Sequence, residues 1–168
     1  MITINETNLP GVMLIKPEVF EDHRGQYVEI YNAKNYASPV IGLPPFVQDD
    51  ISVSSRNVLR GIHGDDKTWK LISCLYGRIY LVVLCCDDVS PHKGMWQSFV
   101  LSDTNRHQVL VPPKHGNGHY VLSEKAVFHY KQTEYYDPTS QFTIPWNHVD
   151  YDIWWPCKDP ILSQRDQK

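Results

Sequence analysis

Three basic residues stand close together in the middle of this sequence: Arg60, His63 and Lys70. Arginine and lysine bind phosphate groups, and a histidine exchanges a proton near neutral pH. The apolar run at residues 78–86 follows soon after and is typical of a buried strand. Together these residues indicate a cavity for a small anionic molecule, beside a buried β-strand, in which acid–base chemistry takes place.

Arg60 and His63 lie three positions apart in a segment, residues 58–63, with the composition of a strand. Side chains of a regular strand alternate between its two faces, so these two would point in opposite directions. Both reach one cavity only where the strand carries a bulge or ends. We therefore expect an irregular strand at this place if the two residues act together.

Further candidates for acid–base chemistry are Tyr130, Tyr135, Tyr136 and Asp166. A phenol can donate a proton, although aromatic residues in strands usually pack into the core. Asp166 lies near the end of the chain, where it either orients a histidine or belongs to a solvated tail. The residue types alone leave both interpretations open.

Metal or cofactor sites are not indicated. Metal-binding cupins carry an HxH motif followed by a glutamate, but here Asp65 stands two positions after His63 and no glutamate follows before Arg78. His115 and His119 are surrounded by glycines rather than placed on a regular helix. Neither a glycine-rich nucleotide loop nor a GxSxG elbow is present, which argues against dehydrogenases, kinases and hydrolases. We predict neither metal nor cofactor.

The elements that must position these residues are short strands separated by turn residues. Such a pattern predicts an all-β fold, an antiparallel jelly-roll sandwich, as a single domain over residues 1–168. A short peripheral helix is expected only near residues 31–37 or in the tail. Strands are expected at residues 11–17, 27–31, 51–54, 58–63, 70–75, 78–86, 96–101, 108–111, 120–122 and 127–133, with Gly116 and Gly118 among the turn residues between them.

The composition of the 168-residue chain is ordinary, with a formal charge of −3 that gives no reason to expect nucleic acid as a partner. The N-terminal residues lack the pattern of a signal peptide, and no apolar run is long enough to cross a bilayer. The four cysteines show no CxxC spacing and are expected to be free buried thiols. We therefore expect a cytoplasmic protein without a membrane partner.

Ordered motifs along nearly the whole chain resemble the nucleotide-sugar 3,5-epimerases, typified by the dTDP-4-dehydrorhamnose 3,5-epimerases of the RmlC-like cupin group. Each motif alone is common, but their order and spacing together are specific. The matching segments are DHRGQYVE at 22–29, FVQDD at 46–50, VLRGIH at 58–63, KLISCLYGRIYLVVLCCD at 70–87, SPHKGMWQSFVLS at 90–102, VLVPPKHGNGHYVLSE at 109–124, YKQTEYYDP at 130–138 and ILSQRD at 161–166.

The resemblance implies a cupin jelly roll, a homodimer that exchanges active-site residues, and cofactor-independent epimerisation beside a ketone. In this pattern His63 is the base, Asp166 holds and polarises it, and Tyr130 is the acid on the opposite face of the sugar. Lys70 lies near the C4 oxygen. The resemblance also implies substrate-binding positions: Arg24 and Arg60 for the diphosphate, and Tyr27, Glu29 and Gln48 for the nucleotide.

The chain departs from the family motifs around the sugar and the nucleotide. AHGF becomes Gly116-Asn117-Gly118-His119, and Asn117 and His119 are therefore expected to contact the substrate differently. QDN becomes Gln48-Asp49-Asp50, and Gly64 stands where an aromatic residue is usual. These changes favour the branch acting on GDP-linked 4-keto-heptoses in capsule polysaccharide synthesis, with the small Gly64 leaving room for an extra carbon.

Other functions compatible with these residues are a dTDP-4-dehydrorhamnose 3,5-epimerase, a nucleotide-sugar 3,4-ketoisomerase and a non-catalytic sugar-binding cupin. The full set of His63, Lys70, Tyr130 and Asp166 favours an epimerase, an isomerase that binds a nucleotide-diphosphate sugar. The set does not distinguish inversion at C3, at C5 or at both.

Overall fold

The computed structural model describes residues 2–36 and 43–167, whose regular secondary structure is almost entirely β-strand. The only helix within those residues is α1, a single turn at Ala33–Tyr36, so of the two places where a short helix was expected, residues 31–37 carry it and the tail does not. The elements are β1 (Thr3–Glu6), β2 (Met13–Lys16), β3 (Val19–Asp22), β4 (Gly25–Val28), α1 (Ala33–Tyr36), β5 (Gln48–Ser55), β6 (Leu59–Gly64), β7 (Lys70–Tyr76), β8 (Arg78–Cys85), β9 (Trp96–Ser102), β10 (Gln108–Val111), β11 (His115–Val121), β12 (Lys125–Gln132) and β13 (Phe142–Thr143).

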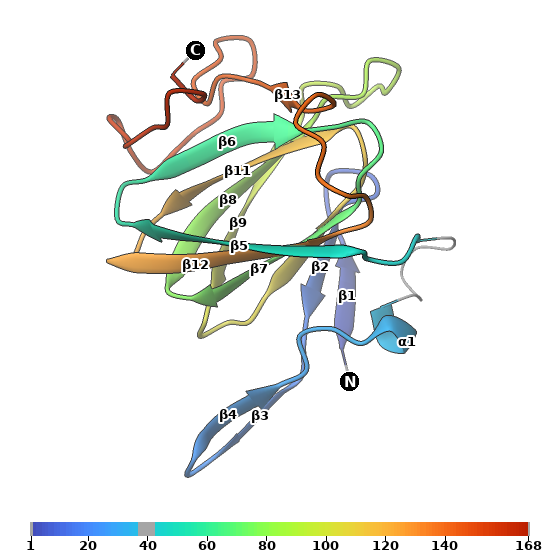
Figure 1. The fold of residues 1–168 in the computed structure, drawn as a ribbon, viewed down its shortest axis with the longest axis vertical. Coiled ribbons are helices and arrows are strands. Elements are labelled where there is room, and N and C mark those ends of the chain that lie inside the picture. Colours follow the sequence, from blue (N-terminus) through green and yellow to red (C-terminus); the bar gives the residue numbers. More distant parts are fainter. Residues whose placement is uncertain (1, 37–42, 168) are drawn as a thin grey trace.

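The strands form two antiparallel sheets packed face to face (Figure 1). The six-stranded sheet has the order β1-β2-β10-β7-β12-β5, and the five-stranded sheet has the order β13-β6-β11-β8-β9. A third, two-stranded sheet is the β3–β4 hairpin, which projects away from the sandwich in Figure 1. The predicted antiparallel jelly-roll sandwich is confirmed.

Strand β8 shows why the sequence has so continuous an apolar run here. Its residues alternate between two cores, as the two-residue period of a strand requires. Leu81 and Val83 pack between the two sheets, whereas Val82 and Leu84 pack on the outer face of the five-stranded sheet. Residues of the C-terminal segment, Trp155 among them, cover that outer face. A strand buried on both faces needs no polar residue in its middle.

Strand β11 is longer than the sequence predicts. We expected turns at Gly116 and Gly118, but both glycines lie within the strand and pair with β8 along its length. They are needed for close packing: a Cβ at Gly116 would lie 2.5 Å from the Ile62 side chain, and one at Gly118 would lie 3.1 Å from the Arg60 carbonyl oxygen. The glycines therefore mark a close approach of β6 to β11 rather than a turn.

The four cysteines are free thiols, with Cys74 and Cys85 buried and Cys86 and Cys157 half-buried. Within residues 2–36 and 43–167, no helix is long and apolar enough to cross a membrane.

Candidate active site

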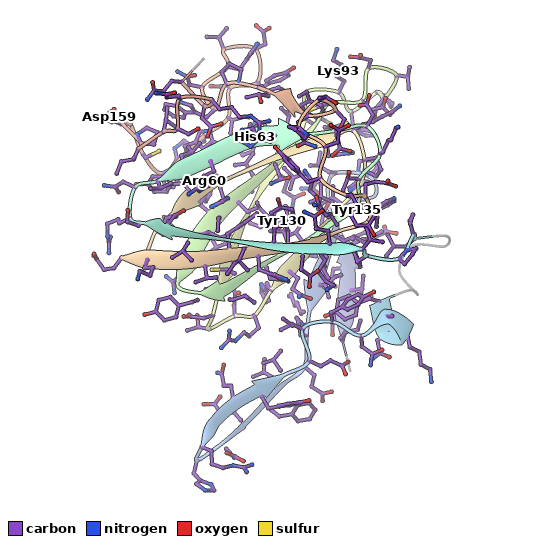
Figure 2. The ribbon with its side chains drawn as sticks, viewed as in Figure 1. Arg60, His63, Lys93, Tyr130, Tyr135 and Asp159 are labelled. Atoms are coloured by element: carbon purple, nitrogen blue, oxygen red, sulfur yellow. The ribbon has the colours of Figure 1, made fainter. Side chains whose placement is uncertain are left out.

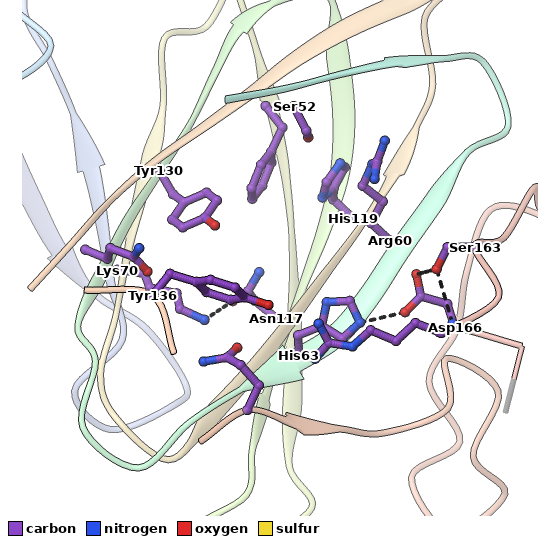
Figure 3. A pocket seen from close by; sticks show the side chains of 14 residues that line it. Ser52, Arg60, His63, Lys70, Asn117, His119, Tyr130, Tyr136, Ser163 and Asp166 are labelled. Atoms are coloured by element: carbon purple, nitrogen blue, oxygen red, sulfur yellow. Dashed lines mark hydrogen bonds and ion pairs between the residues drawn. The ribbon is translucent and has the colours of Figure 1, made fainter. Parts of the chain in front are cut away.

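A cavity of about 320 Å³ lies between the two sheets (Figures 2 and 3). Strands of both sheets supply its walls, and the loop after β12 and the C-terminal segment close its rim. The lining residues are Ser52, Arg60, His63, Lys70, Asn117, His119, Phe128, Tyr130, Gln132, Tyr136, Gln141, Ser163, Arg165 and Asp166.

Arg60 and His63 both line this cavity because β6 is irregular between them. Gly61 has a φ of 122°, a conformation that residues with a side chain rarely adopt. Arg60 pairs with His119 and His63 with Asn117, so three steps along β6 correspond to two along β11. Because of this bulge, the side chains of Arg60 and His63 point to the same face of β6, as the sequence analysis required if the two act together. Arg60 is also fixed by a 3.0 Å hydrogen bond from Nε to Ser54 Oγ.

His63 is held by a buried carboxylate from the C-terminal segment. Its Nε2 lies 2.6 Å from Asp166 Oδ1, and Ser163 Oγ donates to Asp166 Oδ2 over 2.9 Å. The Asp166 side chain is 2% exposed and the His63 side chain 24% exposed. Burial opposes ionisation of Asp166, but the hydrogen bonds from His63 and Ser163 outweigh it and lower its pKa. Asp166 is thus a fixed anion that stabilises a protonated His63.

Lys70 enters the cavity from β7 and contacts β11, with Nζ 3.5 Å from Asn117 Oδ1. Burial is the largest influence on Lys70 and lowers its pKa; the nearby Asp65 carboxylate opposes this change. A lysine in these surroundings is a weakly solvated cation. Such a cation stabilises negative charge on a bound molecule more strongly than a solvated one does.

Tyr130 reaches the cavity from the six-stranded sheet, opposite His63 on the five-stranded sheet (Figure 3). Burial, followed by the Asp50 carboxylate, raises the pKa of Tyr130 to about 12. The phenol is therefore protonated throughout the physiological pH range. A histidine held by a buried carboxylate and a protonated phenol thus face each other across a single cavity.

His119 lies on the cavity wall next to Arg60 and stacks on Phe128, with ring centroids 4.0 Å apart and planes 8° from parallel. Its Nε2 is buried without a hydrogen-bond partner. Burial, and then the charges of Arg60 and His63, lower the pKa of His119 to about 3. His119 is accordingly neutral and serves as a flat polar surface rather than as a base.

Four of the expected binding residues are outside the cavity of this chain. Arg24 and Tyr27 are exposed on the β3–β4 hairpin, where Arg24 pairs with Asp22. Glu29 follows the hairpin and accepts hydrogen bonds from two asparagine side chains. Gln48 lies in the wall behind the cavity, where its amide donates to Asp50 and accepts from the Tyr136 backbone. The remaining expected residues, Arg60, Asn117 and His119, do line the cavity.

The sequence analysis missed several lining residues. Phe128 and Gln132 share the inward face of β12 with Tyr130, so strand alternation from Tyr130 would have identified them. Ser163 lies within the ILSQRD motif itself. Gln141 comes from the loop between β12 and β13, and no local pattern in the sequence marks it as a cavity residue; Tyr136 of the same loop, named as a candidate above, also lines the cavity. In the described part of the chain, no three His, Cys, Asp or Glu side chains are grouped as metal ligands.

The expectation that Gly64 leaves room for a larger sugar is wrong. The space beside Gly64 is filled: a Cβ there would lie 2.5 Å from Phe142 Cζ and 2.5 Å from the His115 carbonyl oxygen. Phe142 comes from β13, whose backbone pairs with β6 at Gly64, and its ring also covers Gly116. An aromatic ring therefore occupies this place, supplied by β13 instead of β6.

Gly64→Ala is expected to lower the free energy of unfolding by about 1–3 kcal/mol, because the new methyl group overlaps packed atoms. One of those atoms is a backbone oxygen of β11, which cannot move aside as a side chain can. Urea unfolding followed by tryptophan fluorescence measures the loss. Phe142→Leu combined with Gly64→Ala should recover only part of it. If Gly64→Ala alone were as stable as the wild type, this description of the packing would be contradicted.

Comparison with known proteins gives a consistent result. The model of the dTDP-4-dehydrorhamnose 3,5-epimerase family matches residues 6–168. The dTDP-4-dehydrorhamnose 3,5-epimerase of Salmonella typhimurium is 37% identical, over 99% of this chain and 93% of that protein. A dTDP-4-dehydrorhamnose 3-epimerase of Streptomyces niveus is 33% identical, over 95% of this chain and 78% of that protein.

Among solved structures, the RmlC 3,5-epimerase of Legionella pneumophila, crystallised with dTDP-4-keto-L-rhamnose, superposes with a TM-score of 0.95. It is 35% identical in sequence, and the superposition covers 99% of this chain and 90% of that one. Fold, family model and sequence identity agree over nearly the whole length. The chain therefore belongs to the dTDP-4-dehydrorhamnose 3,5-epimerase family, a family of nucleotide-sugar isomerases.

Proposed function

We propose that this protein inverts C3, C5 or both centres of a nucleotide-diphosphate 4-keto sugar, without a cofactor. The observation that carries the proposal is the pairing of His63, bound to the buried Asp166, with Tyr130 on the opposite wall. Inversion of a carbon centre needs a base on one face and an acid on the other. A protein that only bound the sugar would not need this arrangement.

The chemistry follows from the ketone. A 4-keto group acidifies the hydrogens on C3 and C5, because the resulting carbanion is delocalised as an enolate. His63 removes such a proton, and Asp166 stabilises the imidazolium that forms. Lys70 stabilises the charge that develops on O4. Tyr130 then donates its proton to the carbon from the opposite face, and the ketone is restored with inverted configuration.

The best-supported substrate is a dTDP-linked 4-keto-6-deoxyhexose of the dehydrorhamnose type, since the relatives named above act on such sugars. The GDP-4-keto-heptose expected from the motif departures has less support, because Phe142 fills the space beside Gly64. Asn117, which lines the cavity, is the departure that still favours a changed substrate. Both nucleotide sugars are therefore offered to the protein in the test of the proposal.

We further propose that the active unit is a homodimer in which the β3–β4 hairpin enters the partner's cavity. The hairpin projects from the sandwich (Figure 1) and exposes Phe20 and Tyr27, which are 55% and 71% exposed. Large apolar side chains on a projecting hairpin favour burial against another surface. Arg24 would then join the partner's Arg60 at the diphosphate, which accounts for its distance from the cavity of its own chain.

The test is incubation of the purified protein in D₂O with a dTDP-4-keto-6-deoxyhexose or a GDP-4-keto-heptose, followed by NMR. Deuterium is expected at C3, C5 or both in an inverted product. Tyr130→Phe should still allow exchange at the carbon facing His63 while inversion is lost. Migration of the ketone to C3 would indicate a ketoisomerase. No exchange with either sugar would refute the proposal and favour a binding protein.

A further inference from the structure

Asp50 stands directly behind Tyr130. The two residues are opposite partners in the antiparallel ladder of β5 and β12, so their side chains lie next to each other on the same face. Asp50 Oδ2 accepts a hydrogen bond from Gln48 Nε2 over 2.8 Å and one from Gln132 Nε2 over 3.2 Å. The two amides hold the carboxylate through one oxygen, Oδ2.

The neighbouring Asp49 has a different environment. Asp49 points to the outer face of the sheet, where Lys131 Nζ lies 2.7 Å from each of its carboxylate oxygens. Asp50 has amide partners instead, and amides do not neutralise its charge. An uncompensated carboxylate beside a phenol opposes loss of the phenolic proton, because a phenolate would repel it. This effect adds to that of burial and contributes to the Tyr130 pKa of about 12.

Asp50 is also one of the positions where the chain departs from the family motif, which has an uncharged asparagine there. The change places a negative charge behind the acid of the reaction. The aspartate at position 50 contacts neither the cavity nor the base, because Asp50 does not line the cavity and His63 lies on the other sheet.

We propose that Asp50 is a positioning residue that holds the Tyr130 hydroxyl and its proton, so that the enolate returns to its original configuration more often than it would with a neutral residue at position 50. This inference rests on the proposed function. In the inverting step the Tyr130 O–H bond breaks, a C–H bond forms, and the enolate electrons restore the C4 ketone. The resulting phenolate regains its proton from water, and His63 gives its proton to water.

In the returning step, His63 gives a solvent-derived proton back to the same carbon face. His63 is partly exposed, so its proton exchanges with water while the enolate is bound. Each return in D₂O therefore leaves deuterium in a substrate of unchanged configuration. The ratio of deuterated substrate to deuterated epimer at early times measures how the enolate is divided between His63 and Tyr130.

Asp50→Asn is expected to lower this ratio by about threefold to tenfold, because a phenol without a carboxylate beside it gives up its proton more readily. Asp49→Asn is the matched control: it is the same substitution on the same strand, but on the outer face. It should leave the ratio unchanged. Damage to the fold alone would lower both exchange and inversion and leave their ratio as it is. An unchanged or increased ratio in Asp50→Asn would refute the proposal.

A second measurement needs no substrate and therefore separates this inference from the proposed function. Tyrosine labelled with ¹³C at Cζ reports phenol ionisation by NMR, and Tyr130→Phe identifies the Tyr130 signal. In Asp50→Asn this signal should begin to titrate at lower pH than in the wild type, whereas Asp49→Asn should match the wild type. The same titration onset in all three proteins would overturn the proposal even if epimerisation itself were confirmed.

Discussion

His63→Asn is expected to abolish deuterium uptake at every carbon that depends on this base and to reduce turnover by about 10²–10⁴-fold. Asparagine is similar in size and can still donate a hydrogen bond to Asp166, so the fold and the cavity should persist. It cannot take up a proton near neutral pH. Turnover measured by NMR, together with KM, should show that the loss lies in kcat.

Asp166→Asn is the matched variant for this result, since it removes the charge behind His63 and keeps the shape. We expect a smaller loss than for His63→Asn, because an amide can still hold the ring but does not stabilise its protonated form. Ser163→Ala removes only one hydrogen bond to Asp166 and should have the smallest effect of the three. Full activity in His63→Asn would assign the base to another residue.

Lys70→Met is expected to reduce kcat by about 10²–10³-fold, the range found when one group that stabilises an oxyanion is removed. Methionine fills a similar volume and suits the buried position, so stability should change little. The control is Lys131→Met, which removes a lysine from the outer face of the neighbouring strand β12. It should leave kcat unchanged.

The pH dependence provides an independent check on Lys70. Burial lowers the pKa of Lys70, so its positive charge is lost at a lower pH than that of an ordinary lysine. Activity that needs the charge should therefore decline on the alkaline side before an exposed lysine would titrate. The residual activity of Lys70→Met should lack this decline. An identical alkaline limb in both proteins would exclude Lys70 as its origin.

Much of the fold was predictable because strand alternation and turn residues are local signals. Residues 70–75 and 78–86 correspond closely to β7 and β8, whose side chains are buried as their apolar pattern indicates. The glycines of β11 were misread, because a glycine needed for close packing looks like a turn residue in the sequence. Only the neighbouring strand, distant in sequence, reveals which role it has.

The candidate site was predictable in part for the same reason. The motif resemblance identified the residues that meet in the cavity, including Asp166, which is 103 positions from His63. It did not reveal that a bulge at Gly61 turns Arg60 and His63 to one face. The nucleotide-binding role of Gln48 stays a prediction, and in this chain the Gln48 side chain hydrogen-bonds Asp50 and the Tyr136 backbone. Such roles depend on long-range packing, which no local pattern encodes.

The contact between Phe142 and Gly64 has a consequence for protein engineering and for the divergence of this family. Because the Phe142 ring fills the space beside Gly64, large residues at positions 64 and 142 exclude each other. A larger residue at position 64 is therefore tolerated better after Phe142 has been made smaller, although the His115 carbonyl oxygen still limits the space. Redesign of this contact between β6 and β13 should begin with the reduction of Phe142.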